Sequence, residues 1–210
     1  MPNKVKQFLE KIVKEKAPGP AATFSALHML RAIELLAEKH VGRNKLAKEL
    51  GIGEGAVRTL ISRLKEAGLL STSKTGCTLT SRGLDFWRDY SKVFRKFSIE
   101  TNELTHAKYN FAMLAKNCGH NVKSGMEQRD AAVKVGAEGA TTIVLKNGQL
   151  MIPSVSDNLL RDFPNAAKQI TGLMRLEEND VVVICGSDRL DLAEYGVLAA
   201  ALTLIKDCHQ

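Results

Sequence analysis

Two arginines and several small polar residues share one face of the helix predicted at residues 54–67. Four apolar residues between Val57 and Leu64 follow the i, i+3, i+4, i+7 spacing of a buried stripe. With that stripe inside, the residues on the outer face are Gly55, Arg58, Thr59, Ser62 and Arg63. Guanidinium groups bind guanine edges or phosphate, and short polar side chains let a helix approach base edges. This face is therefore predicted to read the major groove of double-stranded DNA.

A short helix, a glycine turn and a two-stranded ribbon are predicted around this reading helix. Asn44 is the expected N-cap of a helix over Lys45–Leu50, and Gly51 supplies the tight turn, where a left-handed backbone costs glycine little. After the reading helix, Leu69–Ser71 and Cys77–Leu79 form a ribbon with Lys74 at its tip. This order of elements indicates a winged helix-turn-helix, which places one helix in the major groove.

Further helices are predicted on both sides of this motif. Lys4–Lys16 is basic and amphipathic, so it could contact phosphates, lie on a membrane surface or pack on the next element. Thr23 or Ser25 can cap a helix that ends at about Lys39. Thr80 is expected to cap a long helix to about Phe97 that carries five aromatic residues. Helical spacing favours core packing or a dimer interface for this cluster over stacking on bases.

Charge is divided unevenly along the chain. Residues 1–98 carry 19 Lys and Arg against 9 Asp and Glu, whereas residues 99–210 carry 11 against 14. A basic first half indicates a polyanionic partner for that half alone, although chance clustering of solvated lysines gives the same balance. The hydrophobic content of 44% is that of an ordinary globular protein with its own cores.

The cysteines and the hydropathy indicate a cytoplasmic protein. None of Cys77, Cys118, Cys185 and Cys208 forms a Cys-x-x-Cys pair, and no secretory signal pattern precedes them, so free thiols are expected. The longest apolar run, Tyr195–Ile205, is too short to cross a bilayer. No membrane association is therefore expected.

The second half is predicted to be a small mixed α/β sandwich over residues 104–210, which with the winged helix over residues 1–98 makes an α+β fold. Asn147-Gly148 is a strong hairpin signal between two strands. Ser156 or Asp157 is expected to cap a helix towards Leu173 with a break at Pro164. Other strands are expected at Lys108–Lys116, Ala140–Lys146 and Asp180–Cys185, and helices at Gly125–Ala137 and Leu190–Lys206.

A ligand site in the second half is predicted at Gly186, Ser187, Asp188 and Arg189. This stretch follows a buried strand and opens a helix, where free N–H groups favour an anion. The alternative is that Ser187 or Asp188 simply caps the helix. The glycine pattern matches neither a dinucleotide fingerprint nor a P-loop, so no cofactor is expected. No cysteine and histidine spacing matches a zinc site, and no nucleophile and base are paired, so neither a metal site nor an enzyme is predicted.

Residues 24–97 resemble the winged-helix domain of prokaryotic transcription regulators of the MarR-like and Lrp-like kind. The resemblance is carried by Leu46–Ile52, Val57–Leu60, Leu64–Leu70 and Leu79–Gly83. It implies that Gly55, Arg58, Thr59 and Ser62 read bases, and that Asn44, Arg63 and Lys74 contact phosphate. Gly53-Glu54-Gly55 departs from the usual Ser or Thr cap, which implies a weaker helix start and a repelling charge near DNA.

The whole chain is also similar to an archaeal family in which a winged helix precedes a small α/β domain. Arg129–Ala131, Val135–Thr142 and Lys146–Leu150 carry that resemblance, which implies no known ligand. The leading hypothesis is a sequence-specific transcription regulator that binds DNA as a homodimer, with a C-terminal domain that senses an effector or mediates oligomerisation. The alternatives are an enzyme or a protein-interaction module in which the winged helix is an appendage.

Overall fold

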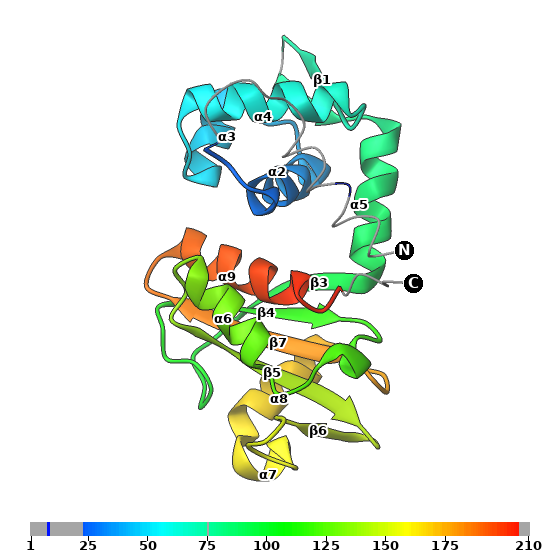
Figure 1. Cartoon of the computed structure of the whole chain (residues 1–210), viewed down its shortest axis with the longest axis vertical. Helices are drawn as coiled ribbons and strands as arrows, with labels where there is room; N and C mark the ends of the chain where they lie inside the picture. The colour runs from blue at the N-terminus through cyan, green and yellow to red at the C-terminus, as the bar shows by residue number, and fades with distance from the viewer. Residues whose placement is uncertain (1–7, 9–22, 75, 206–210) are drawn as a thin grey trace. The chain divides into compact units, whose positions relative to one another are not determined.

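The computed structural model describes residues 8, 23–74 and 76–205, which fall into two compact units (Figure 1). The first unit is Met1–Ser91 and the second is Lys92–Gln210. Apart from Phe8, the basic segment predicted at Lys4–Lys16 lies outside the described residues, as does Cys208. The remaining cysteines, Cys77, Cys118 and Cys185, are free and buried.

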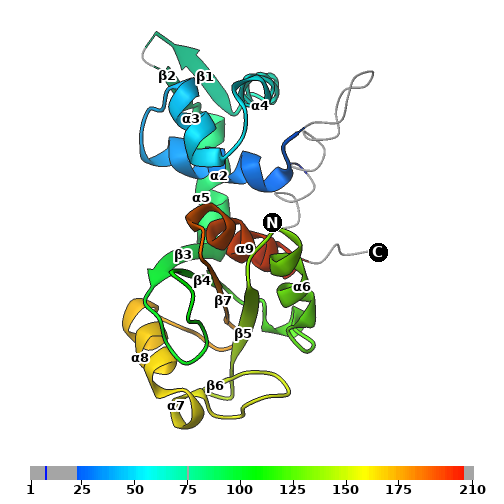
Figure 2. The same cartoon turned by 90° about the vertical axis from the view of Figure 1, so that its left-hand side faces the viewer.

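The first unit is a helix-turn-helix with a two-stranded ribbon, which confirms the winged helix (Figure 2). The elements are α2 (Ala26–Glu38), α3 (Arg43–Leu50), α4 (Glu54–Glu66), β1 (Leu70–Ser73), β2 (Gly76–Leu79) and α5 (Ser81–Val93). Their apolar faces meet in one core whose fully buried members include Leu30, Ile33, Leu46, Leu60 and Leu64. The 3.6-residue spacing of apolar side chains therefore produced the expected helices.

The helix boundaries confirm one predicted turn and correct one predicted cap. Gly51 has φ 65°, the left-handed conformation expected of a tight turn between α3 and α4. The N-cap of α3 is Gly42, however, which has no side chain to accept a hydrogen bond. Asn44 is therefore not the cap, because α3 begins at Arg43 and Asn44 already lies in its first turn.

Thr80 and Gly83 fix the start of α5 against the end of α4. The Thr80 hydroxyl donates to the Gly68 carbonyl at 2.7 Å and accepts from the Gly83 N–H at 3.1 Å, so Thr80 caps α5 as predicted. A Cβ on Gly83 would lie 2.1 Å from the Leu69 carbonyl oxygen. Glycine is therefore required here by the close approach of the two backbones rather than by φ.

The helix predicted to reach Phe97 ends earlier. It stops at Val93, and residues 94–99 form strand β3 (Phe94–Ile99), which pairs with β4 (Tyr109–Ala115). Phe94 and Phe97 consequently belong to the second unit, so the five aromatic residues do not share one helical face. The two compact units divide between Ser91 and Lys92, whereas the first domain was expected to extend to residue 98. From Phe94 to Ile99, backbone hydrogen bonding to β4 outweighs the local helical pattern.

The second unit contains one five-stranded antiparallel sheet with the strand order β3-β4-β7-β5-β6. The other strands are β5 (Gly139–Lys146), β6 (Gln149–Met151) and β7 (Val181–Ser187), and β7 is buried along its whole length at the centre. Asn147 and Gly148 both have positive φ, 52° and 72°, as a two-residue hairpin between β5 and β6 requires. The predicted hairpin is confirmed.

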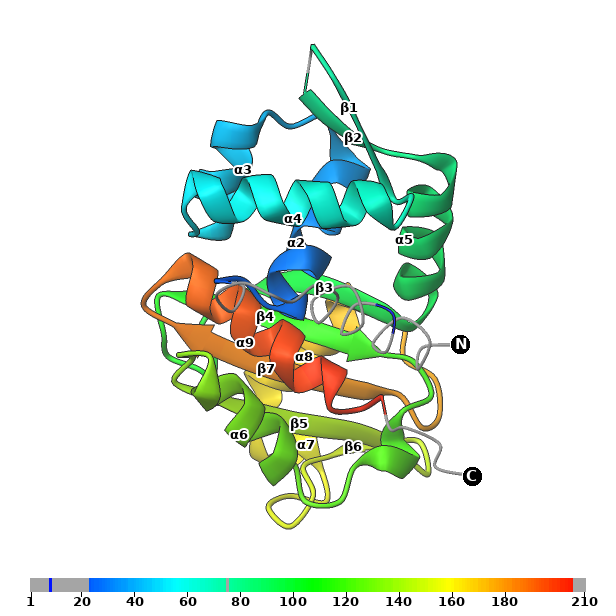
Figure 3. The same ribbon diagram turned by 45° about the horizontal axis from the view of Figure 1, so that its top comes forward.

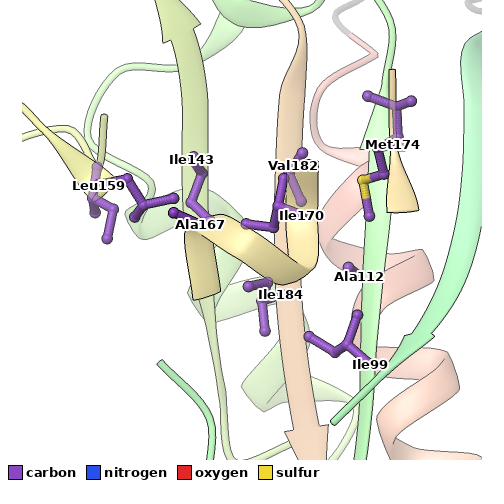
Figure 4. Close-up of a cluster of buried hydrophobic side chains, with 11 residues drawn as sticks. Ile99, Ala112, Ile143, Leu159, Ala167, Ile170, Met174, Val182 and Ile184 are labelled. Carbon is purple, nitrogen blue, oxygen red and sulfur yellow. The ribbon is translucent and has the colours of Figure 1, made fainter. Parts of the chain in front are cut away.

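Helices cover both faces of this sheet. Helices α6 (Met126–Lys134) and α9 (Leu190–Leu202) pack on one face, with α7 (Leu159–Asp162) and α8 (Pro164–Leu173) on the other (Figure 1). Figure 4 shows the core under α7 and α8, where Ile143, Val182 and Ile184 meet Ile170 and Leu159. The predicted break at Pro164 is present, but the cap of α7 is Asn158, whose side chain accepts from the Arg161 N–H at 3.1 Å. Ser156 and Asp157 are therefore not the caps.

Candidate nucleic-acid interface

A groove in the first unit is lined with basic side chains. It lies between the start of α3, the exposed face of α4 and the β1–β2 ribbon, with a volume of about 640 Å³; the ribbon projects from the helices in Figure 3. The cationic residues that line it are Arg43, Lys45, Arg58, Lys65 and Lys74. No carboxylate lines the same groove among the described residues. The groove therefore concentrates positive charge on one surface, which suits a polyanion.

Helix α4 presents the predicted reading face to solvent. Val57, Leu60, Ile61 and Leu64 are buried, as predicted. Gly55, Arg58, Thr59 and Ser62 are all exposed. Thr59 donates to the Gly55 carbonyl at 3.2 Å, and Ser62 donates to Glu66 Oε1 at 3.2 Å, so both hydroxyls are held locally until a ligand replaces those contacts.

The start of α4 has no side-chain cap. Its N-cap is Gly53, and Glu54 lies exposed in the first turn. The Ser or Thr cap expected to be missing at Gly53-Glu54-Gly55 is indeed missing, and Glu54 lies at the N-terminal end of the reading face. Two glycines leave the backbone free to approach a partner closely, since no side chain projects from either position.

The predicted phosphate contacts occupy two different environments. Asn44 and Lys74 both line the basic groove, Asn44 from α3 and Lys74 from the ribbon tip. Arg63 is half-buried, and its guanidinium carbon lies 5.2 Å from the centre of the Phe24 ring. It also borders a shallow depression on α4 with Arg58, Thr59, Ser62 and Glu66. Arg63 is consequently held by a cation–π contact beside the reading face rather than in the groove.

Three basic residues of the groove are missing from the residues that the sequence predicted. Arg43 and Lys45 lie in the first turn of α3, and Lys65 donates from α4 to Thr72 Oγ1 in the ribbon at 3.2 Å. Burial raises the pKa of the Cys77 thiol in β2, whereas the positive charges of Arg43 and Lys65 act to lower it. Both charges act on the same thiol, so Arg43 and Lys65 lie near Cys77 on the groove wall. The overall charge of residues 1–98 was the only sequence signal for them.

Of the four residues predicted as a ligand site in the second unit, two are buried, and two, Asp188 and Arg189, are exposed. Gly186 and Ser187 belong to β7 and are buried, and a Cβ on Gly186 would lie 2.4 Å from Thr105 Oγ1. The Arg189 N–H donates to Ser187 Oγ at 3.3 Å, and the Arg189 side chain pairs with Asp191 at 2.7 Å. Arg189, rather than Ser187 or Asp188, is the N-cap of α9. These contacts leave the polar groups of the stretch engaged within the protein.

The described residues contain neither a metal-binding cluster nor a membrane-spanning helix. No cluster of three or more His, Cys, Asp or Glu side chains in that part of the chain could hold a metal ion. No helix among the same residues is both long enough and apolar enough to cross a membrane.

Two family models match the chain, one in each unit. Residues 25–94 match the model described as the CggR N-terminal DNA binding domain. Residues 106–204 match a domain of unknown function, DUF4443. No curated protein is similar enough to the chain to count as a match. The first match covers α2 to α5 with the ribbon, and therefore includes every residue of the basic groove.

Among solved structures, the hypothetical protein PH0730 from Pyrococcus horikoshii is 26% identical, with a TM-score of 0.69 over 86% of this chain and 92% of that one. A MarR/EmrR family regulator from Acinetobacter is 17% identical, with a TM-score of 0.30 over 42% of this chain and 63% of its own. ZitR from Lactococcus lactis is 21% identical, with a TM-score of 0.30 over 43% and 71%. The first likeness, with the family models, confirms the expected resemblance: a winged helix-turn-helix followed by a small α/β domain.

Proposed function

We propose that the protein is a cytoplasmic transcription regulator that binds double-stranded DNA through its winged helix. The observation that carries the proposal is the groove between α3, α4 and the ribbon, which five cationic side chains line and no carboxylate enters among the described residues. Helix α4 forms one wall of that groove and exposes the short polar face that major-groove reading needs. The match of residues 25–94 to a DNA-binding domain model supports the same function.

The residues of the groove and of the exposed face of α4 divide into two roles. Arg58 is exposed on α4 beside Gly55 and the hydroxyl groups of Thr59 and Ser62. We therefore assign Arg58 to base edges. Gly55, Thr59 and Ser62 allow close approach and contribute short polar contacts. Asn44, Lys74 and the neighbouring cations of α3 and α4 contact phosphates, which position the protein without reading sequence.

A substitution at Arg58 tests the assignment of the reading helix. Arg58→Ala should remove discrimination of about 1–3 kcal/mol at one base-pair position while leaving binding to other positions of the site unchanged. Binding of the full chain to a selected DNA site and to its single-base variants measures this. Arg88→Ala is the control, because Arg88 is exposed on α5 and paired with Asp85 at 2.8 Å. An unchanged preference in Arg58→Ala would show that α4 does not read bases.

We further propose a homodimer. A two-fold arrangement would place two α4 helices in successive major grooves, about 34 Å apart. The length and symmetry of the protected DNA segment test this, since a monomer protects a single unsymmetrical half-site.

A protein-docking module is the alternative use of a winged helix. It shares the fold, but its binding should not follow the salt dependence that counterion release imposes on a DNA ligand. We favour a regulator over an enzyme because residues 25–94 match a DNA-binding domain model.

A further inference from the structure

The second unit contains a buried hydroxyl that forms no hydrogen bond. Thr142, in β5, is 3% exposed, and its Oγ1 atom has no hydrogen-bond partner among the described residues. Burying a hydroxyl without a partner destabilises a protein, so such a group in a folded domain needs an explanation. A ligand that supplies the missing partner is one explanation.

The Thr142 side chain lies beside the N-terminus of α6. The N-cap of α6 is Gly125, which has φ 82° and no side chain to accept from the first N–H groups of the helix. A Cβ on Gly125 would lie 3.2 Å from Thr142 Cβ and 3.3 Å from Thr142 Oγ1, so the unpartnered hydroxyl lies next to the open end of the helix. Unpaired N–H groups at the start of a helix favour a negatively charged ligand. Two independent features thus converge on one point.

A cavity of about 220 Å³ opens at this point, and we call it the β5-edge pocket. Its lining residues are Leu104, Ser124, Gly125, Met126, Arg129, Ala140, Thr141, Thr142, Ile152, Pro153, Val155 and Phe163. Most of its wall is apolar, and two of its residues, Met126 and Val155, are 50% and 71% exposed. Strand β6 pairs only with Val144–Lys146, so the outer edge of β5 beside Thr142 carries no strand in the described sheet.

Arg129 supplies the positive charge of the pocket. It is exposed on α6, one turn beyond Gly125, and forms no ion pair within the described residues. It also borders a second concavity that shares Leu104, Ala140 and Thr141 with the first. A single guanidinium beside a helix N-terminus suits a monoanion, and its planar fork matches a carboxylate.

We propose that the β5-edge pocket binds a small carboxylate that carries an apolar group. The carboxylate accepts from the α6 N–H groups, Arg129 and the Thr142 hydroxyl, and the apolar group lies against Ile152 and Phe163. The volume limits the ligand to about ten non-hydrogen atoms, because it falls below the range of about 300–1,000 Å³ that drug-sized ligands occupy. The apolar wall disfavours inorganic phosphate, whose oxygens all require polar partners.

The role of this pocket as an effector site rests on the proposed function, whereas its occupation by a carboxylate does not. The pocket lies within the second unit, and the basic groove lies within the first. A ligand titration without DNA therefore tests the pocket alone. A titration that shows no ligand binding would not contradict the DNA proposal. A DNA experiment that shows no binding would not contradict the pocket.

Calorimetric and thermal-shift titration of the full chain with phenylacetate and isovalerate tests the proposal, with phenylacetamide as the uncharged analogue of phenylacetate. Ligands of this size should bind with a Kd between about 0.05 and 5 mM. Arg129→Gln should raise the Kd about tenfold or more, because the charge-assisted hydrogen bonds are lost. Arg175→Gln is the matched control, since Arg175 is exposed outside the pocket.

Thr142→Val separates binding from structure. If Thr142 is merely structural, Thr142→Val should raise the melting temperature and change nothing else, because it removes an unpartnered hydroxyl. The proposal expects the same gain in the free protein together with an approximately tenfold rise in the Kd for phenylacetate. No saturable binding of either acid, equal affinity for phenylacetamide, or an unchanged Kd in both variants would each overturn the site.

Discussion

Replacing Lys74 with glutamine at the ribbon tip should flatten the salt dependence of DNA binding. Lys74 lines the basic groove from the turn between β1 and β2, so its ammonium group can reach a phosphate when α4 enters the major groove. Each phosphate that a protein neutralises releases condensed counterions, and the logarithm of the binding constant then falls linearly with the logarithm of salt concentration. The slope reports the number of phosphate contacts, which a binding constant at one salt concentration does not.

The size of the effect follows from the residues that line the groove. Of its five cations, Arg58 is assigned to bases, which leaves Arg43, Lys45, Lys65 and Lys74 for phosphates. With one phosphate each, the slope should be about −3.6 per protomer, a loss of roughly 150-fold in affinity between about 50 and 200 mM salt. Without Lys74 the slope should be about −2.7, and the loss over the same range roughly 40-fold.

Fluorescence anisotropy with a labelled duplex at several salt concentrations gives both slopes for the full chain. Lys146→Gln is the matched control, because Lys146 is exposed and belongs to the second unit, where no groove residue lies. The control should keep the slope of the unmodified protein. An identical slope in Lys74→Gln would refute the placement of the ribbon tip on the backbone. A slope near zero in the unmodified protein would refute DNA binding through the groove altogether.

Two stability predictions follow from the packing. Gly83→Ala should destabilise the protein by about 1–3 kcal/mol in urea unfolding, because the added Cβ meets the Leu69 carbonyl. Gly172 lies in α8, and a Cβ added there would meet no atom within 4 Å. Gly172→Ala should therefore be neutral or stabilising by up to about 1 kcal/mol. A loss in Gly172→Ala as large as that in Gly83→Ala would contradict the steric argument. Burial lowers the pKa of His28 from 6.5, so stability should be lost as the pH falls below that value, where the unfolded state binds the proton more readily. His28 Nδ1 accepts from the Ser25 N–H at 3.1 Å, and His28→Gln, which keeps an acceptor, should reduce this pH dependence in thermal melts at pH 5–7.

Local sequence patterns determined most of the elements and the face of the reading helix. The spacing of Val57 to Leu64 placed Arg58, Thr59 and Ser62 outside, because a helix of 3.6 residues per turn admits no other arrangement once its apolar stripe is buried. Gly51 and Asn147-Gly148 marked turns because few other residues adopt positive φ at low cost. These features depend only on neighbours within a few positions.

Tertiary structure alone decided which distant residues meet. Arg43, Lys65 and Lys74 come from three elements, and no local spacing relates them, so the sequence could show their charge but not their shared groove. The strand Phe94–Ile99 forms because β4 is available to pair with it, against a local pattern that favoured helix. The hydroxyl of Thr142 and the open end of α6 at Gly125 meet only because α6 packs on β5. Such sites arise from long-range packing, which no short window of sequence contains.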